Sequence, residues 1–106
     1  MKIPDTIRIN GIEYEIVYVP NLNNGVNIAY GHIDFEKCQI ELNPAENISY
    51  QHRCITMLHE ICHGIVYAAG AKIENEEQIV DMFAKGLYQV LQDNGQKLFD
   101  INTPKS

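Results

Sequence analysis

The five residues from His59 to His63 read His-Glu-Ile-Cys-His, a pattern that could hold and use one metal ion. They lie in an apolar, helix-compatible segment, residues 55–69. Positions i and i+4 of an α-helix lie on one face, about 40° apart, so both histidines can bind the same zinc ion. Glu60 can reach a water on that metal. The pattern therefore predicts a metal, a nucleophile and a base.

Zinc catalysis normally uses three protein ligands and one open position, so the chain should supply a third ligand. The metzincin motif would continue with a glycine and a histidine where this sequence has Val66 and Ala69. By the apolar stripe of the next helical segment, both Glu76 and Glu77 are acceptable ligands. Glu77 is favoured because only it has an acidic residue, Asp81, four positions later.

The Glu-x-x-x-Asp pattern from Glu77 to Asp81, on the helix after His-Glu-x-x-His, resembles the gluzincin metallopeptidases, the thermolysin-like clan. The Phe83-Ala84 pair is similar to the Phe-small pair in that family's second helix. The resemblance implies that Glu77 is the third zinc ligand. It also implies that the Asp81 carboxylate receives the N–H of a zinc-bound histidine, His59.

The chain from about residue 12 to residue 94 also resembles small metallopeptidase-like proteins of phages and mobile elements, related to the ImmA/IrrE group. The segments that carry this resemblance are Gly31–Asp34, Ile40–Pro44, Thr56–Glu60 and Gly86–Leu91. The resemblance implies a phage-type protein with zinc as its cofactor.

Size and composition predict one small globular domain spanning residues 1–106. Of these 106 residues, 45% are hydrophobic and 21% are charged, which are ordinary globular values. A chain of this length can bury one modest core. No stretch approaches the roughly 18 apolar residues of a membrane span, and the N-terminus lacks the apolar region of a signal peptide. We therefore expect neither a membrane segment nor a leader.

The net charge and the cysteines indicate which classes of partner and which cellular compartment to expect. The formal net charge is −6 and no lysine or arginine cluster occurs, which argues against a nucleic-acid partner. The cysteines at 38, 54 and 62 are odd in number and lack metal-knuckle spacing. Reduced thiols in a cytoplasmic protein are the simplest interpretation. The expected partners are a protein or peptide substrate, or a regulatory protein.

The first half of the chain, about residues 6–43, has the pattern of β-strands. Apolar and polar residues alternate in its first segment, and Asn10-Gly11 is the strongest two-residue hairpin signal. The strands are expected at residues 6–10, 12–19, 28–34 and 38–42. We expect them to form a small antiparallel sheet of about four strands.

The second half, about residues 49–94, predicts two helices. Ser49 is a good N-cap for a helix that runs to about residue 69, and Gly70 follows where a glycine commonly ends a helix. The second helix is expected at about 74–93, ended by Asn94-Gly95, with residues 95–106 as a flexible tail. The sequence thus predicts an α+β domain, resembling a minimal zincin, in which a helix hairpin against the sheet carries the metal site.

The motif and the resemblance together predict a zinc-dependent peptidase. Zinc held by His59, His63 and Glu77 would lower the pKa of a water, and Glu60 would take its proton as a general base. The result would be hydrolysis of a peptide bond in a protein or peptide substrate.

Residues beyond the metal motif could contact the substrate. A hydrogen-bond donor for the oxyanion is usual, and the candidates are Tyr67, Tyr50 and His52. His52 lies about 10 Å from His59 along the helix axis, too far to be a ligand in the same helix. If the strand at 38–42 is an exposed edge, it could bind a peptide by strand addition.

The alternative is a non-catalytic protein in which zinc staples the helices to the sheet and an acidic surface engages a regulator. The presence of Glu60 favours the enzyme, because a purely structural site does not need that residue.

Overall fold

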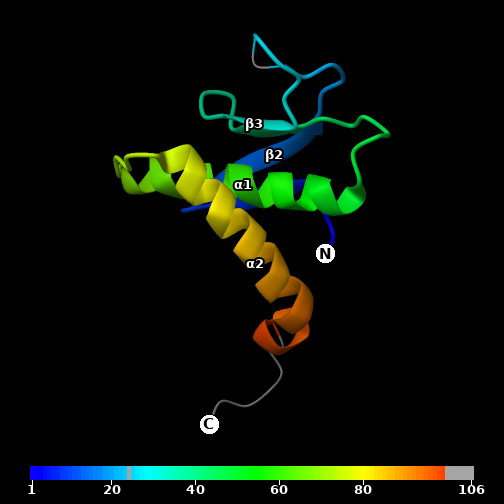
Figure 1. Ribbon diagram of the computed structural model, residues 1–106. Helices are drawn as coiled ribbons and strands as arrows, with labels where there is room; N and C mark the ends of the chain where they lie inside the picture. Colours follow the sequence, from blue (N-terminus) through cyan, green and yellow to red (C-terminus); the bar gives the residue numbers. More distant parts are fainter. Residues whose placement is uncertain (24, 100–106) are drawn as a thin grey trace.

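The computed structural model describes residues 1–23 and 25–99, and shows four strands followed by two helices (Figure 1). The α+β class expected from the sequence is therefore confirmed. The elements are β1 (Thr6–Ile9), β2 (Ile12–Tyr18), β3 (Gly31–Asp34), β4 (Gln39–Leu42), α1 (Tyr50–Ala69) and α2 (Glu76–Leu98).

The strands form one sheet in the order β1-β2-β4-β3. β1 and β2 are antiparallel around the Asn10-Gly11 turn, with Ile9 opposite Ile12, and β3 and β4 are also antiparallel. β2 and β4, however, run parallel, which corrects the expectation of a wholly antiparallel sheet. The cause is the long loop after β2, which carries the chain to the outer edge. The β3–β4 hairpin then returns β4 to the side of β2.

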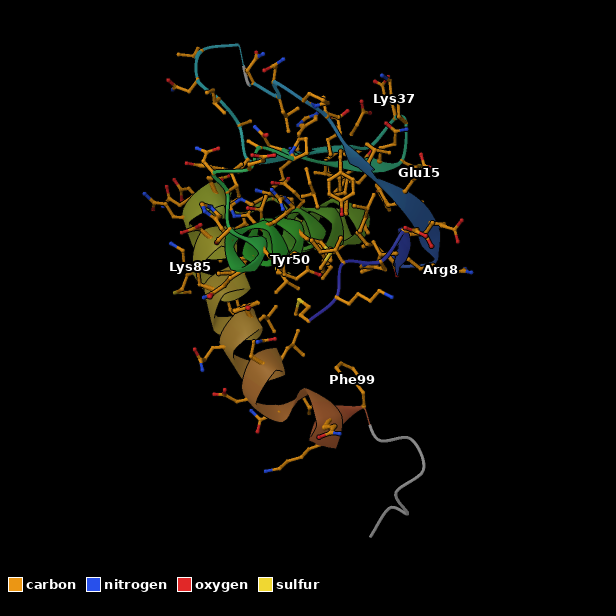
Figure 2. All side chains as sticks on the ribbon, turned by 90° about the vertical axis from the view of Figure 1, so that its right-hand side faces the viewer. Arg8, Glu15, Lys37, Tyr50, Lys85 and Phe99 are labelled. Carbon is orange, nitrogen blue, oxygen red and sulfur yellow. The ribbon has the colours of Figure 1, made fainter. Side chains whose placement is uncertain are left out.

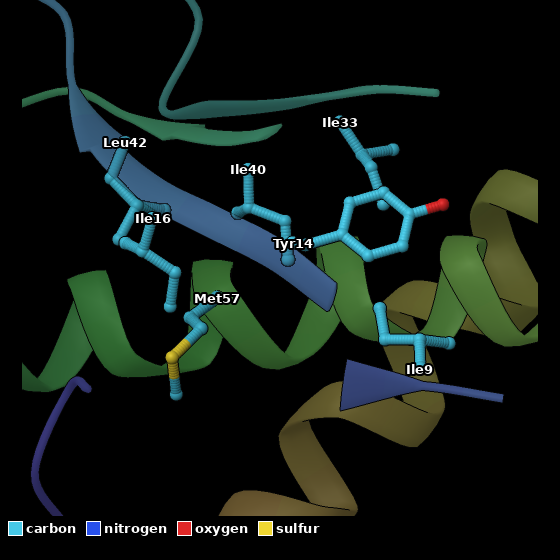
Figure 3. Packing of buried hydrophobic residues seen from close by; sticks show 7 residues of the cluster. All are labelled: Ile9, Tyr14, Ile16, Ile33, Ile40, Leu42 and Met57. Carbon is cyan, nitrogen blue, oxygen red and sulfur yellow. The ribbon is translucent and has the colours of Figure 1, made fainter. Parts of the chain in front are cut away.

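One face of this sheet is covered by α1, which contacts β1, β3 and β4. The core between the two layers is aliphatic, with one tyrosine, and burying each such side chain stabilises the fold by about 1.5–3 kcal/mol. Figure 3 shows the central cluster, which consists of Ile9, Tyr14, Ile16, Ile33, Ile40, Leu42 and Met57. Because α1 supplies Met57 to this cluster, the helix is fixed on the sheet.

Both ends of α1 have the caps that the sequence predicts. The Ser49 hydroxyl accepts a hydrogen bond from the backbone N–H of His52 at 3.0 Å. Gly70 has a φ of 66°, a left-handed conformation that strains residues with a Cβ, and its N–H donates to the carbonyl oxygen of Tyr67. The local signals therefore set the length of this helix.

The second helix is longer than expected and extends away from the sheet (Figure 1). It continues to Leu98, so the predicted stop at Asn94-Gly95 is wrong. Residues 95–98, which were expected to belong to a flexible tail, are part of the helix. The Asn94 amide donates to the carbonyl oxygen of Val90 within the helix instead of ending it. Residues 100–106 of the expected tail lie outside the described residues.

Among the described elements, α2 contacts only α1, so the helix hairpin packs on the sheet through α1 alone. Figure 2 shows Phe99, at the end of α2, far from the strands. Within the described part of the chain, neither helix is apolar enough over a sufficient length to span a bilayer.

Candidate metal centre

Five polar side chains meet where the two helices pack on each other. His59 and His63 lie one turn apart on α1, and Glu76, Glu77 and Asp81 lie in the first two turns of α2. The helices bring the imidazole rings of α1 and the carboxylates of α2 to one place.

The helix contact beside this group is close and apolar. Val80 and Ala84 of α2 are almost fully buried, and α1 is the element that α2 contacts. Both helices are therefore fixed by packing before any ion is considered.

Two histidine nitrogens and one carboxylate converge at the centre. The Nε2 atom of His59 is 2.6 Å from Oε1 of Glu77, and the Nε2 atom of His63 is 2.9 Å from Oε2 of the same carboxylate. The two Nε2 atoms are 3.2 Å apart. The ligand atoms of these three residues lie within 4.8 Å of one another, so His59, His63 and Glu77 could hold a metal ion.

The other ring nitrogens face two further carboxylates. The Nδ1 atom of His63 is 2.6 Å from Oε2 of Glu76, and the Nδ1 atom of His59 is 3.6 Å from Oδ1 of Asp81. Carboxylates in such positions commonly orient histidines whose opposite nitrogen binds a metal. Asp81 thus lies beside His59 as the gluzincin resemblance implies. Asp81 also accepts a hydrogen bond from Lys85, which is the main reason that its pKa is lowered.

Glu76 is the site residue whose role the sequence did not indicate. The apolar stripe shows that it faces α1, but the stripe cannot distinguish a metal ligand from a partner of the opposite ring nitrogen. In the structure Glu76 contacts Nδ1 of His63, on the side of the ring away from Glu77. The adjacent residues Glu76 and Glu77 therefore contact the two different nitrogens of the His63 imidazole ring, Nδ1 and Nε2.

At the centre, hydrogen-bond acceptor atoms face one another, and an added proton or a cation would give them a partner. A carboxylate only accepts hydrogen bonds, so the Nδ1 atom of His63 must carry the proton shared with Glu76. The Nε2 atom of a neutral His63 then directs a lone pair at Oε2 of Glu77, which is also an acceptor. Burial disfavours a second proton on His63, but the hydrogen bond to Glu76 and the charges of Glu60 and Glu77 outweigh burial and raise its pKa. A divalent cation would satisfy the same atoms.

Glu60 lies next to this group on the α1 side. It is only 8% exposed, and burial raises the pKa of its carboxyl despite the opposing effect of His59 and His63. Close approach of β3 encloses it, because a Cβ at Gly31 would lie 3.4 Å from Cγ of Glu60 and 2.5 Å from Cγ2 of Thr56. A carboxyl with a raised pKa is suited to accept and release a proton.

Two adjoining hollows of about 610 and 600 Å³ meet at the candidate metal centre. Both are lined by Gly31, His59, Glu60 and Glu77. Together they form what we call the site groove, bounded by α1, by β3 and by the first turns of α2. The Glu60 side chain and the candidate ligands His59 and Glu77 thus lie where the two hollows adjoin.

The candidates His52 and Tyr67 lie at opposite ends of the site groove. The ring of His52 contacts Tyr30, with centroids 4.5 Å apart, and the ring of Tyr67 stacks on Phe35 at 3.8 Å. Along the α1 axis His52 lies about 12 Å from Glu60, and Tyr67 lies about 10 Å from it in the other direction. Both residues line the groove, and their roles as hydrogen-bond donors to an oxyanion stay predictions.

Two other sequence-based candidates lie elsewhere. The hydroxyl of Tyr50, which is labelled in Figure 2, accepts a hydrogen bond from the backbone N–H of Ile3 at 2.9 Å. Tyr50 is not among the residues that line the groove. The strand expected to be an exposed edge, β4, lies between β2 and β3. The edge strand beside the groove is instead β3, which lines it with Gly31 and Ile33.

The three cysteines are free, in agreement with the expectation of reduced thiols. Cys62 lies between Ile61 and His63 within the His-Glu-x-x-His sequence of α1, but burial raises the pKa of its thiol. Because the thiolate is the form that binds metals, this residue is a poor ligand at neutral pH.

Comparison with protein-family models, with curated proteins and with solved structures finds no match to this chain. The assignment of the site therefore depends on the residues and their geometry.

Proposed function

We propose that this protein is a zinc-dependent peptidase that hydrolyses a peptide bond with Glu60 as general base. One observation carries the proposal: the Nε2 atoms of His59 and His63 converge on the Glu77 carboxylate, and the buried Glu60 lies beside them on a groove.

The donor set fits zinc. Two imidazole nitrogens and one carboxylate oxygen are a known ligand set of catalytic zinc sites, which keep a further position open for water or substrate. The Glu77 side chain is 72% exposed, so the centre is accessible from the groove. When bound, zinc would lower the pKa of a water and polarise the scissile carbonyl.

The protein's own contribution to the reaction is the movement of one proton. The Glu60 carboxylate accepts the proton as the water oxygen attacks the carbonyl carbon. It then gives that proton to the nitrogen of the leaving amine as the C–N bond breaks. Burial raises the pKa of the Glu60 carboxyl, and a stronger base takes the proton from water more readily.

Among the strands of the described residues, β3 lies at the edge of the sheet, which supports an extended peptide as the substrate. Tyr30, just before β3, accepts a backbone hydrogen bond from Asn43 at 2.9 Å. In an antiparallel ladder, residues alternate between facing the partner strand and facing away from it. This alternation directs the backbone N–H and C=O of Gly31 and Ile33 to the open side, where a peptide could add as a further strand.

A second candidate function is a non-catalytic regulatory protein in which zinc joins α1 to α2. The observation that favours it is that α2 contacts no other described element, so a shared ion would strengthen its attachment. The same ligands serve both functions, and only the peptidase requires the proton transfer by Glu60.

A cleavage screen tests the peptidase. Zinc-loaded protein is incubated with a peptide mixture from a denatured cell extract, and new termini are identified by mass spectrometry. We expect new termini that vanish after chelation and return when zinc is restored. Fully loaded protein that produces no new termini would leave the regulatory function as the better explanation.

A further inference from the structure

The stacked pair Phe35–Tyr67 forms one end of the site groove. The two rings are nearly parallel, with an interplanar angle of 6° and centroids 3.8 Å apart. This stack connects the segment after β3 with the last turns of α1 and lines the same hollow as His63 and Glu76. An aromatic wall thus stands beside the candidate metal centre.

The Tyr67 side of the stack is left largely exposed by the residues that the structure describes. Tyr67 remains 60% exposed although Phe35 occupies one side of its ring. Val66 lines the groove beside it, so the surroundings are apolar on the α1 side. Aromatic rings gain about 0.5–1.5 kcal/mol from stacking beyond the burial of their area. Phe35 already fixes the orientation of the Tyr67 ring, so a third aromatic ring could stack on the exposed face of Tyr67.

The distance from the centre defines which substrate residue would reach this ring. Tyr67 follows His63 by one turn, which is about 6 Å along the α1 axis. An extended peptide advances about 3.3 Å per residue, so a side chain at the stack belongs within two residues of the bond at the metal centre.

We infer that the outer face of Tyr67, supported by Phe35, is a subsite for an aromatic side chain within two residues of the scissile bond. This inference rests on the proposed function for the position of that bond, but the subsite itself can be detected by binding. Glu76 and Glu77 line the same hollow, which disfavours an acidic side chain there. The substrate class is accordingly an extended peptide with an aromatic residue on this side of the bond.

The test compares the binding of two synthetic peptides to the zinc-loaded Glu60→Gln full chain, in which turnover is suppressed. One is an acetylated and amidated alanine hexapeptide, and the other has one central phenylalanine. We expect the phenylalanine peptide to bind roughly three- to tenfold tighter, with NMR shift changes at residues 31–35 and 63–67. Equal affinity for both peptides, or binding of neither, would overturn the subsite.

Variants of two tyrosines make this comparison specific. Tyr67→Leu keeps apolar bulk and Tyr67→Ala removes the side chain, and each should abolish the preference for phenylalanine. Tyr18→Ala removes a half-exposed tyrosine of β2 outside the groove and should leave the preference intact. A preference that survives in both Tyr67 variants would contradict the inference. If wild-type protein binds the phenylalanine peptide selectively but never cleaves a peptide, the subsite stands and the peptidase fails.

Discussion

Replacing Glu77 with alanine is expected to weaken zinc binding by well over tenfold. This carboxylate contacts the Nε2 atoms of both histidines, so its removal leaves two ligands where catalytic zinc sites have three. Competition with a chromophoric chelator would measure the affinity. Glu74→Ala is the matched control, because it removes the same charge from an exposed position just before α2 and should leave the affinity within about twofold of wild type.

The neighbouring carboxylates should have smaller effects in the same titration. Glu76→Gln and Asp81→Asn alter partners of the Nδ1 atoms, and losses of about 10- to 100-fold are typical of such groups. The Glu76 contact, at 2.6 Å, is shorter than the Asp81 contact at 3.6 Å, so Glu76→Gln should be the more damaging of the two. A larger loss for Glu76→Gln than for Glu77→Ala would show that the ligand assignment is wrong by one residue.

Glu60→Gln is expected to lower peptide cleavage by about 10²- to 10⁴-fold, the usual contribution of a general base. The amide keeps the shape of the side chain but cannot accept the proton from water. Zinc content and melting temperature should stay close to wild type, because Glu60 is absent from the group of converging ligand atoms. Cleavage rates at equal zinc occupancy give the comparison.

Glu46→Gln provides the control for this experiment, because it makes the same change at an exposed loop position outside the groove. The variant also separates the two candidate functions. In a regulatory protein stapled by zinc, Glu60→Gln should keep biological activity in the native host. A Glu60→Gln protein with full zinc and undiminished cleavage would exclude the proton transfer proposed here.

Features encoded over a few neighbouring residues could be predicted from the sequence. The two histidines need only the helical repeat to share a face, and α1 ends at Ser49 and Gly70 because these caps act within one turn. The β1–β2 hairpin is equally local, since Asn10-Gly11 determines its register. Predicting that Glu77 lies beside the two histidines also required a second helix packed at the correct angle. The spacing of four residues between Glu77 and Asp81 was the sequence feature that favoured Glu77 over Glu76.

Features that depend on distant contacts could not be predicted in the same way. The parallel pairing of β2 with β4 depends on where a long loop returns the chain, and no short motif specifies that path. The role of Glu76 depends on the rotation of α2 about its axis against His63, which the apolar stripe defines only coarsely. The length of α2 was underestimated because Asn94-Gly95 resembles a helix stop, whereas a helix tolerates one glycine at a cost of about 1 kcal/mol.

Zinc content after native purification of the full chain tests the central claim most directly. Elemental analysis should find about one zinc per chain, in keeping with a single three-ligand site. A strong chelator should lower the melting temperature, and added zinc should restore it, because an ion that binds only the folded state stabilises it. Zinc below roughly a tenth per chain, together with no thermal shift on adding zinc, would contradict the assignment of His59, His63 and Glu77 as its ligands.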